Sequence, residues 1–146
     1  MNDAVARALN KSQRECGERR TSLEQEGRRL DEQIARIKLT VSEAERSELR
    51  ARYAADGAAT DYDKFRVYYD GLAEHERLPA NRRTLEQMAE DRANNIRLHT
   101  QAEASVQRER KNLNDAVADQ TALQEELRSL DQEYSSIANQ ITKLPV

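Results

Sequence analysis

The sequence predicts an all-α fold, a long antiparallel two-helix coiled-coil hairpin with a short helical aromatic segment after the turn and a kink or break near Pro79. Three observations predict it. Apolar residues recur at heptad spacing over residues 85–144, they recur again over residues 6–51, and the composition is too polar for a broad core.

The carboxyl-terminal heptad run, over residues 85–144, is the longer of the two. Every seventh residue from Leu85 and every seventh from Met88 form two rows in which 13 of 18 sites are apolar. Alternating steps of three and four residues place these side chains on one narrow stripe of a helix. Such a stripe is typical of a coiled-coil seam, the line along which two helices pack.

The amino-terminal heptad run supplies the partner helix. Ten of the fourteen heptad sites within residues 6–51 are apolar, and the simplest arrangement folds the two helices back on each other. Gln13, Arg20 and Gly27 weaken the first half of this run, which then lies beside the strong half at 113–144. The tip of the hairpin either offers unmatched apolar surface to another protein, or its polar sites only fix the register of the helices.

The composition excludes a broad globular core and argues against nucleic-acid binding. The chain has 146 residues, of which 35% are charged and 4% aromatic. Its 27 acidic and 24 basic residues interleave along both runs, so no basic face for phosphates is predicted. Abundant Arg, Glu, Gln, Ala and Leu favour helix, although so polar a chain is also compatible with partial disorder in the absence of a partner.

The expected elements fill a single elongated domain, residues 1–146. They are helix one over about 3–56, a turn at about 57–60, an aromatic helical segment over 61–77 and helix two over about 81–143. Gly57 marks the end of helix one, because glycine favours the left-handed cap conformation.

Three local features refine this order of elements. Just before the turn the apolar pattern shifts off the heptad sites to Leu49 and Tyr53. Thr60, with an acidic residue three positions later, forms a capping box that starts the aromatic segment. Beyond Pro79, which interrupts the helical pattern, Asn81 or Thr84 caps the continuation.

The aromatic segment is the most distinctive stretch of the chain. It holds four of the six aromatic residues. At helical spacing Phe65, Tyr69 and Leu72 share one face, with Tyr62 a turn earlier. Such a cluster either closes the end of the hairpin or forms an exposed docking patch, since aromatic anchors dominate many protein interfaces.

No catalytic or ligand-binding constellation is predicted. The chain has no glycine-rich phosphate loop, and neither His75 nor His99 has a neighbouring Cys or second His at metal-ligand spacing. His99 falls on the seam, where a tolerated polar core residue is the expected role, and Cys16 is expected to be a small buried hydrophobe. We therefore expect no enzyme, no metal and no cofactor, since a hairpin also lacks a water-excluding pocket.

Two stretches carry a resemblance to a known family. One is the charged helical run Leu-Glu-Gln-Glu-Gly-Arg-Arg-Leu-Asp-Glu-Gln-Ile-Ala-Arg-Ile at 23–37, and the other is the pattern Tyr62-x-x-Phe65-x-x-x-Tyr69-x-x-Leu72. With the chain length and the two-helix layout, they look like the FliJ/YscO family. These are the central stalk proteins of flagellar and virulence-associated type III secretion systems, whose virulence members are also called SctO or HrpO.

The resemblance implies a shaft between two partners. In the family the paired terminal helices insert into the ring of the hexameric secretion ATPase, the turn end reaches the large export-gate membrane protein, and secretion chaperones also bind. The match implies export-gate contacts at Tyr62, Phe65, Tyr69, Leu72 and Glu76, and an ATPase-facing tip at Leu9, Cys16, Ile137 and Ile141. Tyr69 departs from the family, where an aliphatic residue is more usual, as does Glu76, where a histidine can occur.

The resemblance also bears on location. No apolar run approaches 18 residues and no signal-peptide core follows Met1, so the chain is expected in the cytoplasm, peripheral to the secretion apparatus at the inner membrane. The short chain without a basic tail favours a virulence-type over a flagellar system. Two other classes stay open, a self-associating structural coiled coil and a helical adaptor or chaperone that holds client proteins.

Overall fold

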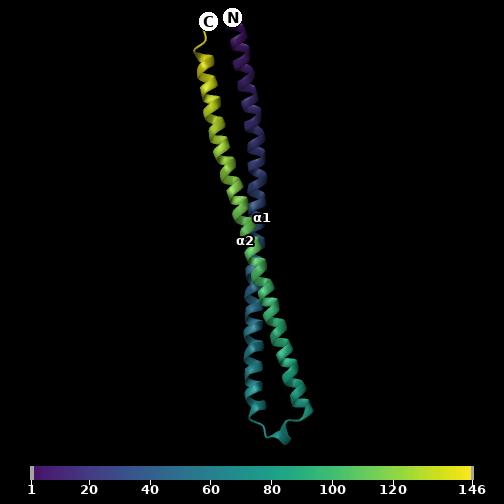
Figure 1. Ribbon diagram of the computed structural model, residues 1–146. Coiled ribbons are helices and arrows are strands. Elements are labelled where there is room, and N and C mark those ends of the chain that lie inside the picture. Colours follow the sequence, from purple (N-terminus) through teal and green to yellow (C-terminus); the bar gives the residue numbers. More distant parts are fainter. Residues whose placement is uncertain (1, 146) are drawn as a thin grey trace. The chain divides into compact units, whose positions relative to one another are not determined.

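The computed structural model describes the backbone of residues 2–145 and the side chains of residues 3–145. It consists of α1 (Asn2–Asp70), a short 3-10 helix η1 (Glu74–Glu76) and α2 (Pro79–Thr142), as Figure 1 shows. Within this range there is no strand. The predicted all-α helical hairpin is confirmed.

The helices pack in two compact units, each described by itself. The termini unit contains Met1–Ile37 and Asn112–Val146, and the turn unit contains Lys38–Lys111. The single domain expected from the sequence stays a prediction.

The two helices run antiparallel in the termini unit. The Cys16 thiol reaches the carbonyl oxygen of Leu130 at 3.5 Å, whereas Gly27, further along α1, faces the earlier residue Leu123. Arg19 donates to Glu126 at 2.6 Å across the same pair of helices. The weak amino-terminal half of the seam therefore lies beside the strong carboxyl-terminal half, as the heptad pattern predicts.

Heptad sites form the core of the termini unit. A buried cluster of Cys16, Leu23, Leu123 and Leu130 is flanked by two partly buried leucines, one from each helix. A methyl group added at Gly27 would come 3.2 Å from the Leu123 side chain, so glycine lets that leucine lie close against α1. Arg20 and Tyr134, at two predicted seam positions, are exposed and so are not part of this core.

In the turn unit the heptad seam of α1 continues without the predicted shift. Leu49 and Tyr53 are exposed, whereas Ala55 is buried. The half-buried sites continue the alternation of three and four steps; they are Glu48, Ala51, Ala58, Tyr62, Phe65, Tyr69 and Leu72. The predicted shift to Leu49 and Tyr53 is therefore wrong, because the heptad sites themselves stay on the buried side of α1.

The turn predicted at 57–60 is wrong, because α1 continues through these residues to Asp70. Among the described residues no glycine has a positive φ, so Gly57 does not form a left-handed cap. The Thr60 hydroxyl donates to the Asp56 carbonyl at 2.9 Å, the backward bond of a threonine inside a helix rather than a cap. The aromatic residues up to Asp70 therefore belong to α1 and precede the turn.

The connection between the helices spans residues 71–78. Its start is held by Arg77, whose guanidinium donates to the Asp70 carbonyl oxygen at 3.1 Å. Pro79 is the first residue of α2, a position where its fixed φ fits and its missing N–H costs nothing, so the predicted break falls there. The predicted caps are wrong, since Asn81 and Thr84 lie inside α2, the latter bonding back to a carbonyl four residues earlier.

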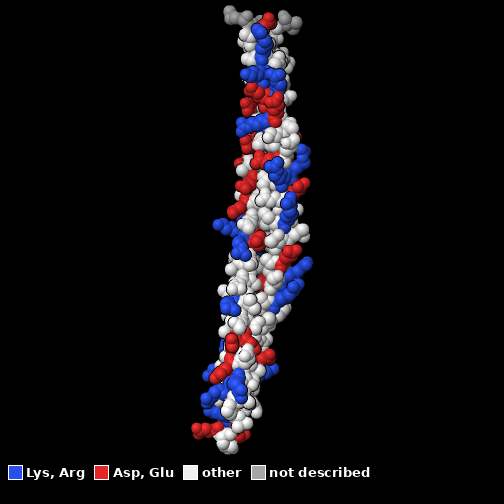
Figure 2. Space-filling view, turned by 90° about the vertical axis from the view of Figure 1, so that its right-hand side faces the viewer, with Lys and Arg blue, Asp and Glu red and all other residues white. Residues whose placement is uncertain are grey.

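Charged side chains cover the outside of both units. On the face shown in Figure 2, acidic and basic residues interleave and neither sign forms a block. Within the described part of the chain, no helix is long and apolar enough to cross a membrane.

Candidate functional site

The aromatic residues predicted as a docking surface lie on the seam side of the turn unit. Tyr62, Phe65, Tyr69 and Leu72 are each half-buried. Glu76 lies instead in η1, where its carboxylate accepts a hydrogen bond from the Ala73 N–H at 3.4 Å. Tyr62, Phe65 and Tyr69 thus lie along the seam side of α1, and Leu72 lies two residues beyond the end of that helix. Glu76 is separated from them because α1 ends at Asp70.

Arginine side chains cover two of the tyrosine rings. The guanidinium carbon of Arg92 on α2 is 5.2 Å from the centre of the Tyr62 ring, and that of Arg77 is 5.4 Å from the centre of the Tyr69 ring. Both distances are within the range of cation–π attraction. The buried Nε of Arg92 has no hydrogen-bond partner among the described residues. Each ring is therefore partly covered by an arginine, that of Tyr62 by one on α2 and that of Tyr69 by one in the connection.

Tyr62 is also tied to its own helix. Its hydroxyl oxygen accepts a hydrogen bond from the Arg66 guanidinium at 3.1 Å. This bond raises the pKa of Arg66, and the nearby Asp70 carboxylate raises it further.

Three apolar residues near the turn are exposed and were not predicted as a site. Val67, Tyr68 and Leu78 are 75%, 56% and 57% exposed. The Tyr68 ring lies 5.7 Å from the Phe65 ring, centre to centre, so it extends the half-buried cluster outward. We call Val67, Tyr68 and Leu78 the turn patch. The sequence signal for it was the first tyrosine of the Tyr68-Tyr69 pair, because Tyr68 falls off the seam whereas Tyr69 lies on it.

The residues predicted for the ATPase-facing tip also lie in the seam. Leu9, Ile137 and Ile141 are half-buried, and Cys16 is 6% exposed. Burial, followed by the Glu133 and Asp131 carboxylates, raises the pKa of the Cys16 thiol. The thiol thus stays neutral and acts as the small hydrophobe that the sequence predicts. The tip does not present these four side chains as one open apolar patch.

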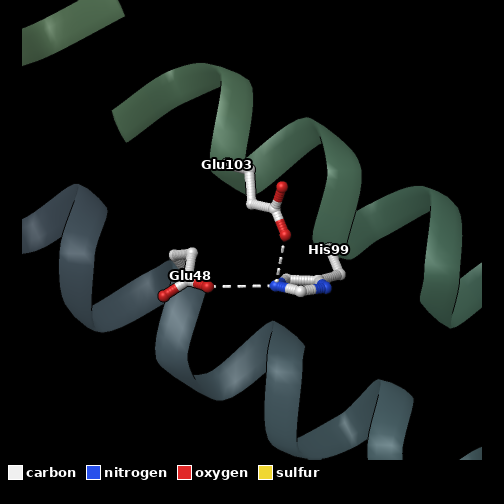
Figure 3. A group of neighbouring side chains, drawn as sticks. All are labelled: Glu48, His99 and Glu103. Carbon is white, nitrogen blue, oxygen red and sulfur yellow. Dashed lines mark hydrogen bonds and ion pairs between the residues drawn. The ribbon is translucent and has the colours of Figure 1, made fainter. Parts of the chain in front are cut away.

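A polar cluster in the turn unit was not predicted as a site. It consists of Glu48 from α1 and of His99 and Glu103 from α2 (Figure 3). His99 Nε2 is 3.0 Å from Glu48 Oε1 and 2.9 Å from Glu103 Oε1. Both carboxylates therefore converge on one ring nitrogen. The Glu48 and His99 side chains are each 21% exposed and that of Glu103 is 57% exposed.

The cluster borders an open groove between the two helices. The groove has a volume of about 450 Å³ and is lined in part by Glu45, Glu48, Glu103 and Arg110. Arg110 bonds Glu45 at 3.2 Å, so that carboxylate is already paired. Arg52 lies further from the cluster, with its Nε 3.9 Å from Glu48 Oε1.

Sequence reasoning placed His99 on the seam correctly but searched for ligands only along one helix. The spacing of His99 and Glu103 by one helical turn was a usable signal. The partner Glu48 becomes visible only when the register of the two helices is known.

The comparisons add no relative. No family model, no curated protein and no solved structure matches this chain.

Proposed function

We propose that this chain is a non-enzymatic stalk or escort protein of a type III export apparatus, which acts by binding rather than by chemistry. The observation that carries the proposal is the position of the family-like aromatic segment. It lies at the turn of an antiparallel helix pair, beside the exposed turn patch. The packed seam gives the patch a rigid base.

The turn patch is the proposed contact with the export gate. Exposed Tyr68 stacks near half-buried Phe65, and an aromatic residue supported from below loses little freedom on binding. Phe65 and Leu72 would be partly covered by the partner. Tyr62 and Tyr69, held under arginines, would keep the helices in place for this contact.

The termini unit is the proposed contact with the hexameric secretion ATPase. Since Leu9, Cys16, Ile137 and Ile141 pack in the seam, their role there is to keep the two helices together. The contacts themselves would come from the exposed side chains, which include Val5, Tyr134 and the interleaved charges. Secretion chaperones are further proposed partners, and the protein would work in the cytoplasm, peripheral to the apparatus at the inner membrane.

A binding assay with the cytoplasmic domain of the export gate tests the first contact. Replacing Tyr68 by Ala should weaken binding by about tenfold or more, as expected for an aromatic hot spot. Tyr53→Ala is the matched control, because Tyr53 is 67% exposed in the same unit but lies away from the turn. Equal effects of the two substitutions, or no binding by the unmodified chain, would refute the gate contact.

An ATPase assay tests the second contact. Adding the full chain to the secretion ATPase of the same organism should increase ATP turnover and hexamer formation. Polar substitutions at Leu9 and Ile137 should reduce this stimulation, because they loosen the helix pair. Unchanged turnover with no binding would contradict the stalk function.

A self-associating coiled coil is the second candidate, and one observation favours it. Leu39, Tyr53 and Val67 are exposed on α1 and succeed one another at intervals of two heptads, so they share a face away from the seam. Light scattering at low micromolar concentration tests this function. A stable dimer that Leu39→Glu abolishes would support it, and a monomer would exclude it.

A further inference from the structure

We propose that Glu48, His99 and Glu103 form a binding site for one divalent transition-metal ion of the zinc type, which links α1 to α2 in the turn unit. The inference is independent of the proposed function. It rests on the convergence of three ligand-type side chains from both helices (Figure 3).

A single ring nitrogen faces two carboxylates in this cluster. One carboxylate oxygen of Glu48 and one of Glu103 both lie within 3.0 Å of His99 Nε2. That nitrogen carries at most one proton, so it can direct one good hydrogen bond and not two. A metal ion between the three atoms would accept a lone pair from each, which satisfies both carboxylates and the imidazole together.

The distances fit small, tetrahedral coordination. The three ligand atoms all lie within 4.8 Å of one another. Zinc bonds of about 2.0–2.2 Å at tetrahedral angles require ligand atoms about 3.3 Å apart. The Nε2–carboxylate distances of 3.0 and 2.9 Å are slightly shorter than this spacing, and rotation of the flexible Glu side chains would bring the ligand atoms to it. The fourth position would open on the groove of about 450 Å³, where water can complete the shell.

The donor set selects the class of metal. Imidazole nitrogen suits zinc and its neighbours among the transition metals, whereas calcium and magnesium prefer oxygen ligands alone. The two carboxylates neutralise the charge of a divalent ion, and the partial burial of Glu48 and His99 strengthens the attraction. Arg52, whose Nε is 3.9 Å from Glu48 Oε1, is a competing cation.

Metal binding to the full chain, stripped with EDTA, tests the proposal. Zinc chloride titrated in a calorimeter should bind at one ion per chain, and cobalt chloride should give the absorption bands of tetrahedral Co²⁺. Zinc at about 100 times its Kd should raise the Tm by several degrees, because only the folded chain holds the site. Loss of an outer-shell partner costs about 10–100-fold in affinity, so removal of a ligand should cost at least as much.

Matched variants distinguish this site from surface binding. His99→Gln and Glu103→Gln should each weaken zinc binding at least about tenfold, as for any lost ligand. His75→Gln removes the other histidine, in exposed η1, and Glu45→Gln removes a carboxylate of the same groove, so both should leave affinity unchanged.

Three outcomes would overturn the proposal. They are no zinc binding by the unmodified chain, binding that His99→Gln leaves intact, and loss of binding in His75→Gln. Circular dichroism checks that the variants remain helical. Glu103 is more than half exposed, so its substitution keeps the test valid should His99→Gln fail to fold.

Discussion

Substituting Gly57 by Ala should stabilise the protein, because α1 runs unbroken through this residue. A Cβ atom at Gly57 would meet no atom within 4 Å, and the residue has a negative φ. Alanine is better than glycine inside a helix by about 0.8–1 kcal/mol, and nothing in the surroundings reduces that gain. We therefore expect the free energy of unfolding to rise by about 1 kcal/mol and the Tm by about 3 °C.

Urea unfolding followed by circular dichroism at the helical band measures the change. Gly17→Ala is the matched positive control, since a Cβ there also meets open space. Gly27→Ala should gain less or nothing, because its new methyl group would lie 3.2 Å from Leu123 Cδ2. In a chain that already carries Leu123→Ala, that contact is absent, so Gly27→Ala should then raise the free energy of unfolding as the other glycine substitutions do. A helix that ended at Gly57 in the left-handed conformation would instead lose about 1 kcal/mol on this change, and that result would refute the continuous helix.

Two further predictions concern the buried cluster of the termini unit. Leu123→Ala should lower the free energy of unfolding, measured by urea unfolding, by about 2–5 kcal/mol, because it leaves a cavity in that cluster. The control Val67→Ala, at an exposed site, should lower it by less than about 0.5 kcal/mol. The Cys16 thiol, whose pKa is raised above its ordinary 9.0, should react slowly with iodoacetamide at pH 8, because little thiolate is present and the sulfur is buried. Its reaction should accelerate above pH 9 and in urea, and fast alkylation of the folded chain at pH 8 would contradict the burial.

The sequence alone predicted the helical hairpin and most of its seam. The heptad rows correctly identified Leu23, Leu123 and Leu130 as core residues, because a stripe of apolar side chains can only be buried against a similar stripe. Predictions that relied on a single residue were less successful than those from the heptad pattern. Gly57 was read as a terminator, although glycine also occurs inside helices when packing on either side holds the backbone.

The candidate sites were less predictable, because they depend on how two helices are aligned. Helical spacing grouped Phe65, Tyr69 and Leu72 on one face, and the structure places them there. Spacing could not say that this face lies against α2. The convergence of Glu48 on His99 was invisible for the same reason, since a shift of one heptad would have placed a different residue opposite the histidine.

The division of apolar residues between the two units has a consequence for how the chain folds. The turn unit brings together residues close in sequence, but its seam contains Glu48, Arg92 and His99. The termini unit has the richer core, yet its contacts, such as that between Cys16 and Leu130, join residues 114 positions apart. Closing so long a loop first is entropically costly, and the cost falls once the helices are already joined near the turn. The two helices should therefore pair first near the turn and then progressively toward the termini. Most of the stabilising free energy should be gained only in the last steps.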